Sequence, residues 1–326
     1  MATLKDIAKI LNISTMTVSR AINYPDLVAD DLRKEIFNVI EELDYKPNQA
    51  ARSLVSKKTG VIQIVISKYL NSIDPYFMTL LAGIADYLSD NFYALTVRRD
   101  NDLVYKCDGM IVMGLKKGED KLLNEEVDIP CVIFGKTEYD IDCIDINNRK
   151  GMYDATKYLI DLGHKDIAFV KINEYEDFST ERFEGYVEAL KDNNLQVKDE
   201  YIFNSENNIY AGEQIGDKIF KTTKVSAIIC SSDLLAIGVI TSAKNLNIDI
   251  PKDISIIGFD GVYLNKMVIP HLTTVVQPVY DIGKNLAEVL LNRINNNDLP
   301  KSEIVYELEL LDGDTTSVVN NNYKLL

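Results

Sequence analysis

From Val61 onward, short runs of apolar, β-branched residues alternate with segments that have helical periodicity. Continuous apolar strands separated by helices form parallel sheets that helices cover on both faces. This alternation predicts an α/β fold, and the length of the region fits two such lobes. We expect strands at Val61–Ile66, Tyr93–Val97, Gly109–Met113, Cys131–Phe134, Ile167–Ile172, Val225–Cys230, Ile254–Phe259 and Thr273–Val276. We expect helices at Tyr76–Leu88, Gly151–Leu162, Thr180–Asp192, Tyr210–Phe220, Leu234–Leu246 and Tyr280–Ile294.

The N-terminal region has a different pattern, which predicts three short amphipathic helices at Leu4–Leu11, Ser14–Asn23 and Asp31–Asp44. The second helix directs Met16 and Arg20 away from its apolar edge, which is formed by Val18, Ala21 and Ile22. Two short helices joined by a tight turn are typical of a helix-turn-helix unit, whose second helix enters the major groove of DNA.

Local signals mark the ends of the first two helices. Thr3 and Asp6 have the spacing of a capping box, and Asn12 suits the left-handed conformation that ends a helix. Ser14 is expected to be the N-cap of the second helix.

Residues 47–58 are expected to form a hinge helix followed by a linker. Pro47 suits the first position of a helix. The predicted helix has almost no core of its own, and isolated helices this short are marginal in water. We therefore expect it to form only when another surface holds it.

The net charge of −15 would disfavour a nucleic-acid partner if it were evenly spread, but residues 1–58 carry +1 and the remaining 268 residues carry −16. An acidic body with a balanced head is expected to bind DNA through the head alone. No apolar run reaches the roughly 18 residues that span a bilayer, and the N-terminus does not resemble a signal peptide. Four cysteines in or beside apolar segments are expected to be buried free thiols in a reducing cytoplasm: Cys107, Cys131, Cys143 and Cys230.

Catalytic signals are weak in this sequence. Of its two histidines, His164 lies at a predicted helix end, where it is expected to satisfy terminal carbonyls, and His271 precedes a strand. The chain has no Gly-x-Ser-x-Gly, P-loop or Gly-rich dinucleotide turn. We expect no enzyme, no bound metal and no cofactor. A sugar-binding protein of a transport system shares a two-lobed α/β body, but it would need an export signal and would have no use for residues 1–58. These features disfavour that class.

Several motifs occur in a fixed order over about nine-tenths of the chain. In the head they are Thr3-Leu4-Lys5-Asp6-Ile7-Ala8, Ser14-x-x-Thr17-Val18-Ser19-Arg20-x-x-Asn23 and Tyr45-x-Pro47-Asn48-x-x-Ala51-Arg52-Ser53-Leu54. In the body they include Asp74-Pro75-Tyr76-Phe77, Leu162-Gly163-His164-Lys165, Ile257-Gly258-Phe259-Asp260 and Leu272-Thr273-Thr274-Val275-Val276-Gln277-Pro278. Together they resemble the lactose/galactose repressor (LacI/GalR) family of bacterial transcriptional regulators, closest to its branch of catabolite control proteins and sugar-operon repressors.

The resemblance implies an N-terminal all-α helix-turn-helix head with a hinge helix, and an α/β two-lobed body like that of periplasmic binding proteins, with parallel sheets. The head would span residues 1–46, and the hinge helix with its linker residues 47–58. The effector-binding and dimerisation domain would span residues 59–326, with one lobe formed by residues 59–148 and 278–300 and the other by residues 149–277 and 301–326.

In this family the second helix lies in the major groove. Carried over, Thr15, Met16 and Arg20 would reach base edges, with Arg20 suited to bidentate reading of guanine and Met16 to contact with a thymine methyl group. Leu54 matches the leucine of the hinge helix that wedges between base pairs. The other implied contacts with DNA are Thr3, Leu4, Ser14, Thr17, Ser19, Asn23, Tyr45, Asn48 and Ala51.

The resemblance also implies a sugar-type effector between the lobes, at the strand ends where ligands of α/β folds bind. Arg182 and Asp260 match the family positions that hold the effector, whereas Ser232 stands where relatives usually carry Asn. Tyr76 and Phe77 fit either a platform for a sugar ring or the core at a helix start. Asp233 fits either an effector contact or a helix cap. The full set of candidates is Ser67, Asp74, Tyr76, Phe77, Arg182, Ser232, Asp233 and Asp260.

The implied partners are near-palindromic operator DNA, a second copy of the chain and a sugar or sugar phosphate that releases the DNA. The implied place is the bacterial cytoplasm, at the nucleoid when bound to DNA, with no membrane contact. Two alternatives stay open: a regulator that takes a phosphorylated carrier protein as co-repressor, and a purine- or nucleoside-responsive repressor.

The sequence departs from the family at one crossover of the first lobe. Only eleven residues, Arg98–Asp108, separate a predicted strand from Gly109, where relatives place a full helix. A parallel crossover needs about a dozen residues, so Asp102–Lys106 is expected to supply little more than one turn. We hypothesise that this trims one face of the lobe and alters the dimer contact or a co-regulator surface. The C-terminal tail has no leucine heptads for a tetramer.

Overall fold

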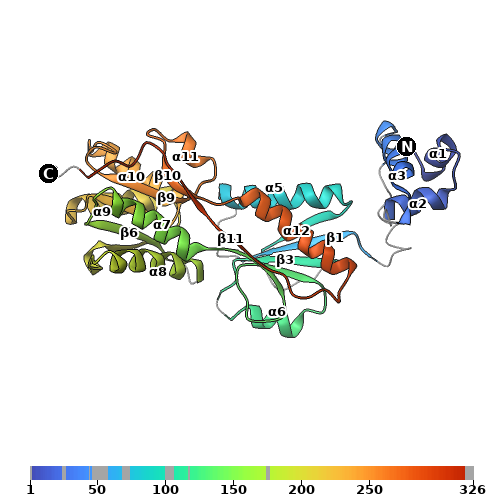
Figure 1. The fold of residues 1–326 in the computed structure, drawn as a ribbon, viewed down its shortest axis with the longest axis horizontal. Coiled ribbons are helices and arrows are strands. Elements are labelled where there is room, and N and C mark those ends of the chain that lie inside the picture. Colours follow the sequence, from blue (N-terminus) through green and yellow to red (C-terminus); the bar gives the residue numbers. More distant parts are fainter. Residues whose placement is uncertain are drawn as a thin grey trace. The chain divides into compact units, whose positions relative to one another are not determined.

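The computed structural model describes residues 2–23, 27–43, 45, 58–67, 74–99, 106–116, 118–173 and 177–319. The chain divides into two compact units, Met1–Gly60 and Val61–Leu326. The first is an all-α head and the second an α/β body (Figure 1). The predicted hinge helix and linker at residues 47–58 lie outside the described residues, apart from Lys58.

The head contains the three predicted helices, α1 (Leu4–Ile10), α2 (Thr15–Asn23) and α3 (Asp30–Glu42). Each contributes one apolar face to a small common core, as their periodicity predicts. The buried members of this core are Ile7, Ala8, Val18, Ala21, Ile22, Ile36, Val39 and Ile40.

The caps of the head are those that the sequence predicts. The Asp6 carboxylate accepts from the backbone N–H of Thr3 at 2.8 Å and from its hydroxyl at 2.7 Å. Asn12 adopts the left-handed conformation with φ 52°. The Ser14 hydroxyl oxygen accepts from the backbone N–H of Thr17 at 3.0 Å, which caps α2.

The body contains two six-stranded sheets, one in each lobe. The first has the order β11-β5-β4-β3-β1-β2, and all of its strands are parallel. Its strands are β1 (Val61–Ile66), β2 (Ala94–Arg98), β3 (Gly109–Met113), β4 (Cys131–Phe134), β5 (Asp142–Ile146) and β11 (Glu303–Tyr306). The second has the order β12-β10-β9-β8-β6-β7, and only β12 runs antiparallel to its neighbour. Its strands are β6 (Ile167–Ile172), β7 (Ile202–Ser205), β8 (Ala227–Cys230), β9 (Ser255–Asp260), β10 (Thr273–Val276) and β12 (Glu309–Leu311).

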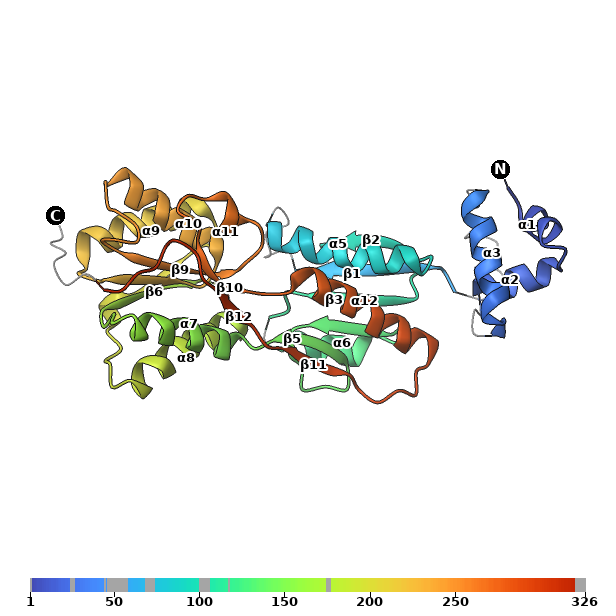
Figure 2. The same cartoon turned by 45° about the horizontal axis from the view of Figure 1, so that its top comes forward.

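Helices cover both sheets, as expected for parallel strands (Figure 2). In the first lobe, α5 (Pro75–Asp90) and α12 (Val279–Asn295) pack side by side, and the short α6 (Asp120–Glu126) belongs to the same lobe. In the second lobe, α9 and α10 cover one face of the sheet, and α7 and α8 cover the other. The helices of this lobe are α7 (Asn148–Asp161), α8 (Asp177–Asp192), α9 (Ile209–Thr222), α10 (Asp233–Asn245) and α11 (Leu264–Met267).

The α5–α12 contact depends on two glycines. A Cβ atom added at Gly83 would collide with the carbonyl oxygen of Tyr280, and one added at Gly283 with the carbonyl oxygen of Leu80. The two helix backbones can therefore approach closely only because neither position carries a side chain.

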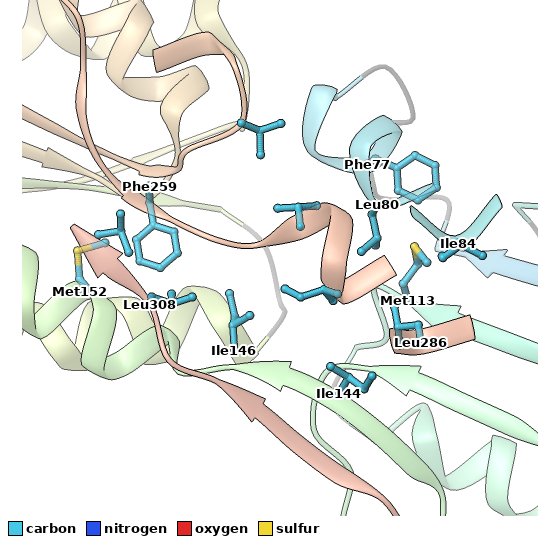
Figure 3. Packing of buried hydrophobic residues seen from close by; sticks show 14 of the residues in the cluster. Phe77, Leu80, Ile84, Met113, Ile144, Ile146, Met152, Phe259, Leu286 and Leu308 are labelled. Carbon is cyan, nitrogen blue, oxygen red and sulfur yellow. The ribbon is translucent and has the colours of Figure 1, made fainter. Parts of the chain in front are cut away.

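The chain crosses between the lobes three times, from β5 to α7, from β10 to α12 and from β11 to β12. Buried apolar side chains join the lobes where these crossings lie. Ile146 and Leu286 of the first lobe belong to the same buried cluster as Met152 and Phe259 of the second, with Leu308 on a crossing segment (Figure 3).

The structure corrects one lobe boundary. Residues 301–326 are predicted to belong to the second lobe, but β11 pairs in parallel with β5 of the first sheet, and only β12 pairs with β10. The third crossing therefore lies at residues 307–308. All eight predicted strands and six predicted body helices are present within three residues of their expected ends. The sequence missed β5, β7, β11, β12, α6 and α11.

The crossover from β2 to β3 has ten residues, of which residues 100–105 lie outside the described part of the chain. The expected single turn at Asp102–Lys106 therefore stays a prediction. None of the described helices is long and apolar enough to cross a bilayer.

Candidate functional site

Helix α2 of the head separates its side chains into a core face and an outer face. Val18, Ala21 and Ile22 are buried in the head. On the other side, Met16 is 68% exposed, and Arg20 is also exposed. The outer face therefore presents an apolar and a cationic side chain together, which suits a thymine methyl group and a guanine edge.

The other predicted DNA contacts of the head differ in their exposure. Thr3, Ser14 and Thr15 are exposed, and Leu4, Thr17, Ser19 and Tyr45 are half-buried. Asn23 is the last residue of α2, and its side chain lies outside what the structure describes. Asn48, Ala51 and Leu54 also lie outside the described residues.

A cleft of about 560 Å³ lies at the carboxyl ends of the parallel strands of both sheets. This is the location that α/β folds use for ligands. Its lining combines carboxylates, amides, three basic side chains and aromatic rings. The lining polar and aromatic residues are Asp74, Tyr76, Phe77, Lys116, Phe134, Lys136, Asp145, Asn148, Asn173, Phe178, Glu181, Arg182, Glu206, Asn207, Asn208 and Asp260.

Five of the eight predicted effector residues line this cleft: Asp74, Tyr76, Phe77, Arg182 and Asp260. Tyr76 stacks near Phe134, with ring centroids 6.4 Å apart and planes 21° apart. Phe77 both lines the cleft and belongs to the buried core of the first lobe. Asp74 caps α5 by accepting from the backbone N–H of Tyr76 at 3.0 Å, and burial raises its pKa.

The other three predicted residues do not line the cleft. Ser67 follows β1, and its backbone N–H donates to the carbonyl of Met113 at 3.2 Å. Ser232 is buried as the N-cap of α10, where its hydroxyl oxygen accepts from the N–H of Leu235 at 3.3 Å. Asp233 is buried behind the cleft as well.

Asp233 ties α10 to the neighbouring strands β9 and β10 behind the cleft. One carboxylate oxygen accepts from the backbone N–H of Gly261 at 2.9 Å, and the other from the hydroxyl of Thr274 at 2.6 Å. It thereby joins α10 to the residue that follows β9 and to the second residue of β10. Burial raises the pKa of its carboxyl group, although these hydrogen bonds oppose that rise.

Arg182 is the buried cation of the cleft, with 5% of its surface exposed. Its Nε donates to Asn148 Oδ1 at 2.8 Å and its Nη1 to the carbonyl of Ser231 at 2.6 Å. Nη1 also lies 3.5 Å from Asp260 Oδ1. The guanidinium stacks on Phe259, 3.7 Å from the ring centre. Arg182 is thus held rigidly, as a buried charge requires.

Asp260 has a strained backbone, with φ 120° in a region that side-chain-bearing residues rarely adopt. Its Oδ1 accepts from Gln277 Nε2 at 2.8 Å in addition to facing Arg182. Burial raises the pKa of its carboxyl group well above the usual range, and the Arg182 charge opposes this. Strain at a residue that lines a cleft is typical of a functional position.

Gln277 joins the two lobes and was missed as a site residue, although it stands in the sequence motif that precedes Pro278. Its Oε1 accepts from the hydroxyl of Tyr76 in the first lobe at 2.8 Å, while its Nε2 donates to Asp260 in the second. Gln277 is only 3% exposed. The three side chains form a continuous polar relay between the two lobes.

A second link crosses the cleft at Lys136, which the sequence also missed. Its ammonium group forms an ion pair with Glu181 of the second lobe and lies 3.8 Å from Asp145 of the first. Burial raises the pKa of Asp145 to about 6, and the charge of Lys136 opposes that rise. Two carboxylates, one from each lobe, therefore share the ammonium group of Lys136.

His164 and the cysteines lie outside the cleft. The ring of His164 contacts the Ser226 hydroxyl at 2.9 Å and the Ser317 carbonyl at 3.0 Å, rather than the helix-end carbonyls that the sequence suggested. Burial lowers its pKa. Three of the cysteines are buried and Cys131 is half-buried, and burial raises the pKa of all four thiols.

Two family profiles match this chain. The one described as "Bacterial regulatory proteins, lacI family" matches residues 3–48, and the one described as "Periplasmic binding protein-like domain" matches residues 156–316. The uncharacterized HTH-type transcriptional regulator YvdE of Bacillus subtilis (strain 168) is 38% identical over 318 residues, which cover 97% of this chain and 100% of YvdE. The chain belongs to the lacI family.

Other lacI-family proteins match over similar spans. The HTH-type transcriptional repressor PurR of Vibrio vulnificus (strain CMCP6) is 32% identical over 98% of this chain and 100% of PurR. The lac repressor dimer bound to operator and the anti-inducer ONPF has a TM-score of 0.75 at 20% identity, covering 97% of this chain and 99% of that one. The CelR–cellobiose complex has a TM-score of 0.72 at 22% identity, covering 97% and 100%. These structures confirm the predicted fold, and the chain is a DNA-binding transcriptional regulator of the lacI family.

Proposed function

We propose that the chain represses genes of carbohydrate use, and that a sugar bound in the cleft changes its affinity for operator DNA. The observation that carries this proposal is the lining of the cleft, where carboxylates and amides stand beside aromatic rings. Such polar groups bond sugar hydroxyls, and an aromatic face covers the apolar side of a sugar ring. CelR in complex with cellobiose, and a lacI-family regulator of Enterococcus faecium with bound ribose, support a sugar as the ligand class.

A neutral sugar suits this cleft better than a sugar phosphate. The lining holds five carboxylates and three basic side chains. Two of the basic side chains are already paired, Arg182 with Asp260 and Lys136 with Glu181. A phosphate would therefore meet an excess of negative charge, whereas the hydroxyls of a neutral sugar can donate to the carboxylates.

The two polar links across the cleft supply the mechanism. A ligand that displaces or strengthens the Tyr76–Gln277 bond or the Lys136–Glu181 pair binds one arrangement of the lobes better than the other. Only such a difference in affinity can shift the arrangement. A coupling of about 1–3 kcal/mol between two binding sites is typical of allosteric proteins. We expect the sugar to act as an inducer that releases DNA.

In the head, we propose that Arg20 and Met16 select the operator sequence. Thr15 reaches a base edge beside them, and Ser14, Thr17, Ser19 and Asn23 bond phosphates and fix the register of the head on the DNA. Leu54 of the predicted hinge helix opens a base step. We place the protein in the bacterial cytoplasm, on the nucleoid at its operator, and assign it no catalytic activity.

A second copy of the chain is the proposed partner, on a near-palindromic operator. Three large apolar side chains that lie close in sequence, at α11 and its flanking residues, are exposed: Tyr263 at 67%, Met267 at 75% and Ile269 at 75%. Exposed apolar clusters mark interaction sites. The lac repressor, whose fold this chain shares, is a dimer on its operator. Met267→Asp should therefore weaken the dimer in sedimentation experiments, whereas the exposed control Val318→Asp should not.

PurR relatives at 32% identity favour a purine as the second candidate ligand. A screen of melting temperatures with monosaccharides, disaccharides, sugar phosphates and purines separates these possibilities. A ligand at 100 times its Kd stabilises the folded protein by about 2.7 kcal/mol. A shift with neutral sugars supports the proposal, and a shift with purines alone would replace it. No shift with any small molecule would favour a phosphorylated carrier protein as co-repressor.

A further inference from the structure

Four asparagine side chains line the cleft, and they differ in what already binds them. Asn148 accepts from Arg182 at 2.8 Å, and Asn208 caps α9 by accepting from the N–H of Ala211 at 2.8 Å. Asn173 is exposed at the end of β6. Asn207 is half-buried and is held by a residue behind the cleft, Ser232.

The Ser232 hydroxyl fixes the orientation of the Asn207 amide. Its oxygen accepts from the backbone N–H of Leu235. A hydroxyl also has one proton that it can donate. It donates this proton to Asn207 Oδ1 at 2.6 Å. Ser232 is 1% exposed and does not line the cleft, so the carbonyl side of the amide faces the protein.

This arrangement leaves the NH₂ group of Asn207 as its ligand-binding group. Within the described part of the chain, no acceptor bonds Asn207 Nδ2. An amide donor at the wall of a cleft, with its other end fixed by a buried hydroxyl, is organised for binding before the ligand arrives. Such preorganisation reduces the entropy cost of binding.

We propose that Asn207 is a specificity-determining residue of the cleft, whose Nδ2 donates to one hydroxyl or ring oxygen of the sugar, and that Ser232 is its positioning residue. The inference rests on the proposed function and deepens it. Ser232, which the sequence predicts to contact the effector, acts through Asn207 instead.

The neighbouring carboxylate of Glu206 also lines the cleft, so acceptors and a donor stand side by side there. A sugar hydroxyl can donate its proton to a carboxylate and accept from the Asn207 amide at once. An analogue that lacks this hydroxyl would leave the amide without a partner. The cleft should therefore discriminate against one particular deoxy sugar.

The test uses the full chain and isothermal titration calorimetry. Glucose, galactose, ribose, maltose and cellobiose are titrated first, and the tightest binder is then compared with its monodeoxy analogues. We expect Asn207→Ala to weaken binding of the parent sugar about 2- to 13-fold, the loss of one neutral hydrogen bond. Asn204→Ala is the matched control, because Asn204 is exposed on β7 and does not line the cleft.

The deoxy series shows whether a specific bond is lost. One analogue should bind the wild type more weakly than the parent sugar does, yet bind Asn207→Ala as well as the parent does. Ser232→Ala should reduce the same discrimination, even if the lost helix cap lowers its overall stability.

Three outcomes would contradict the inference. Wild-type affinity in Asn207→Ala would overturn it alone and leave the proposed function standing. So would an equal loss for the parent sugar and every deoxy analogue, because that indicates a general distortion. A wild type that binds none of the five sugars would contradict the proposed function as well.

Discussion

The substitution Tyr76→Phe removes one hydroxyl from the relay that joins the two lobes. This hydroxyl donates to Gln277 Oε1 at 2.8 Å, and Gln277 is only 3% exposed. A neutral hydrogen bond contributes about 0.5–1.5 kcal/mol net, and leaving a buried acceptor unpaired costs about 1–3 kcal/mol. The ring and its stacking with Phe134 are kept. We therefore expect the free energy of unfolding to fall by about 1–3 kcal/mol.

Urea denaturation followed by far-ultraviolet circular dichroism measures this loss, since the chain has no tryptophan for fluorescence. The control is Tyr87→Phe in the same helix, α5. Tyr87 is half-buried, and its hydroxyl has no hydrogen-bond partner among the residues that the structure describes. Equal losses in Tyr76→Phe and Tyr87→Phe would refute the reasoning.

A second background isolates the bond between Tyr76 and Gln277. In the Gln277→Met variant the hydrogen-bond acceptor is already absent. Tyr76→Phe should therefore lower the free energy of unfolding of this variant by less than about 0.5 kcal/mol, which is the scatter seen between independent sites. Additive losses would show that this hydrogen bond contributes nothing to the link between the lobes.

Three further predictions follow from single residues. Arg20→Ala should reduce the discrimination between operator base pairs by about 1–3 kcal/mol without changing the affinity for the sugar. Selection from random DNA measures the discrimination and calorimetry measures the sugar affinity. A loss of sugar binding would contradict this role. Burial raises the pKa of Asp145 to about 6, above the usual aspartate value of 3.8, so the folded chain holds a proton that the unfolded chain releases. Its contribution to stability should therefore fall as the pH rises from about 4 to 6, by up to about 3 kcal/mol. Asp145→Asn should remove this slope from urea series measured across that range, and an unchanged slope would count against the assignment. Gly283→Ala places a Cβ atom against the carbonyl oxygen of Leu80 and should lower the melting temperature by several degrees, whereas Glu288→Ala, on the exposed side of the same helix, should not.

The strands that the sequence predicts and those that it misses differ in how their polar residues are satisfied. β3 and β8 are continuous apolar runs, buried along their whole length, so composition alone identifies them. β5 contains two buried aspartates, and in the sequence alone aspartates are typical of loops rather than of buried strands. Arg293 from α12 donates to Asp142 through two nitrogens at 2.8 Å each, so a partner distant in sequence satisfies this buried carboxylate.

The same reason separates the predicted site residues from the missed ones. Arg182 in α8 and Asp260 at the end of β9 are indicated by the family resemblance, and Tyr76 lies in the first turn of α5; all three line the cleft. Ser232 also follows a strand, but its hydroxyl serves α10 and Asn207. Gln277 acquires its role from two partners, one in each lobe, which no local pattern reveals.

In our proposal, sugar binding in the cleft and DNA binding at the head are coupled. Fluorescence anisotropy tests this coupling. A labelled operator, selected by the protein from random DNA, is titrated with protein first without sugar and then with a saturating concentration of the sugar found in the melting screen. We expect the operator Kd to rise about 5- to 150-fold with the sugar, and the sugar Kd to rise by the same factor with saturating operator. An operator Kd that is unchanged by a sugar shown to occupy the cleft would contradict the claim.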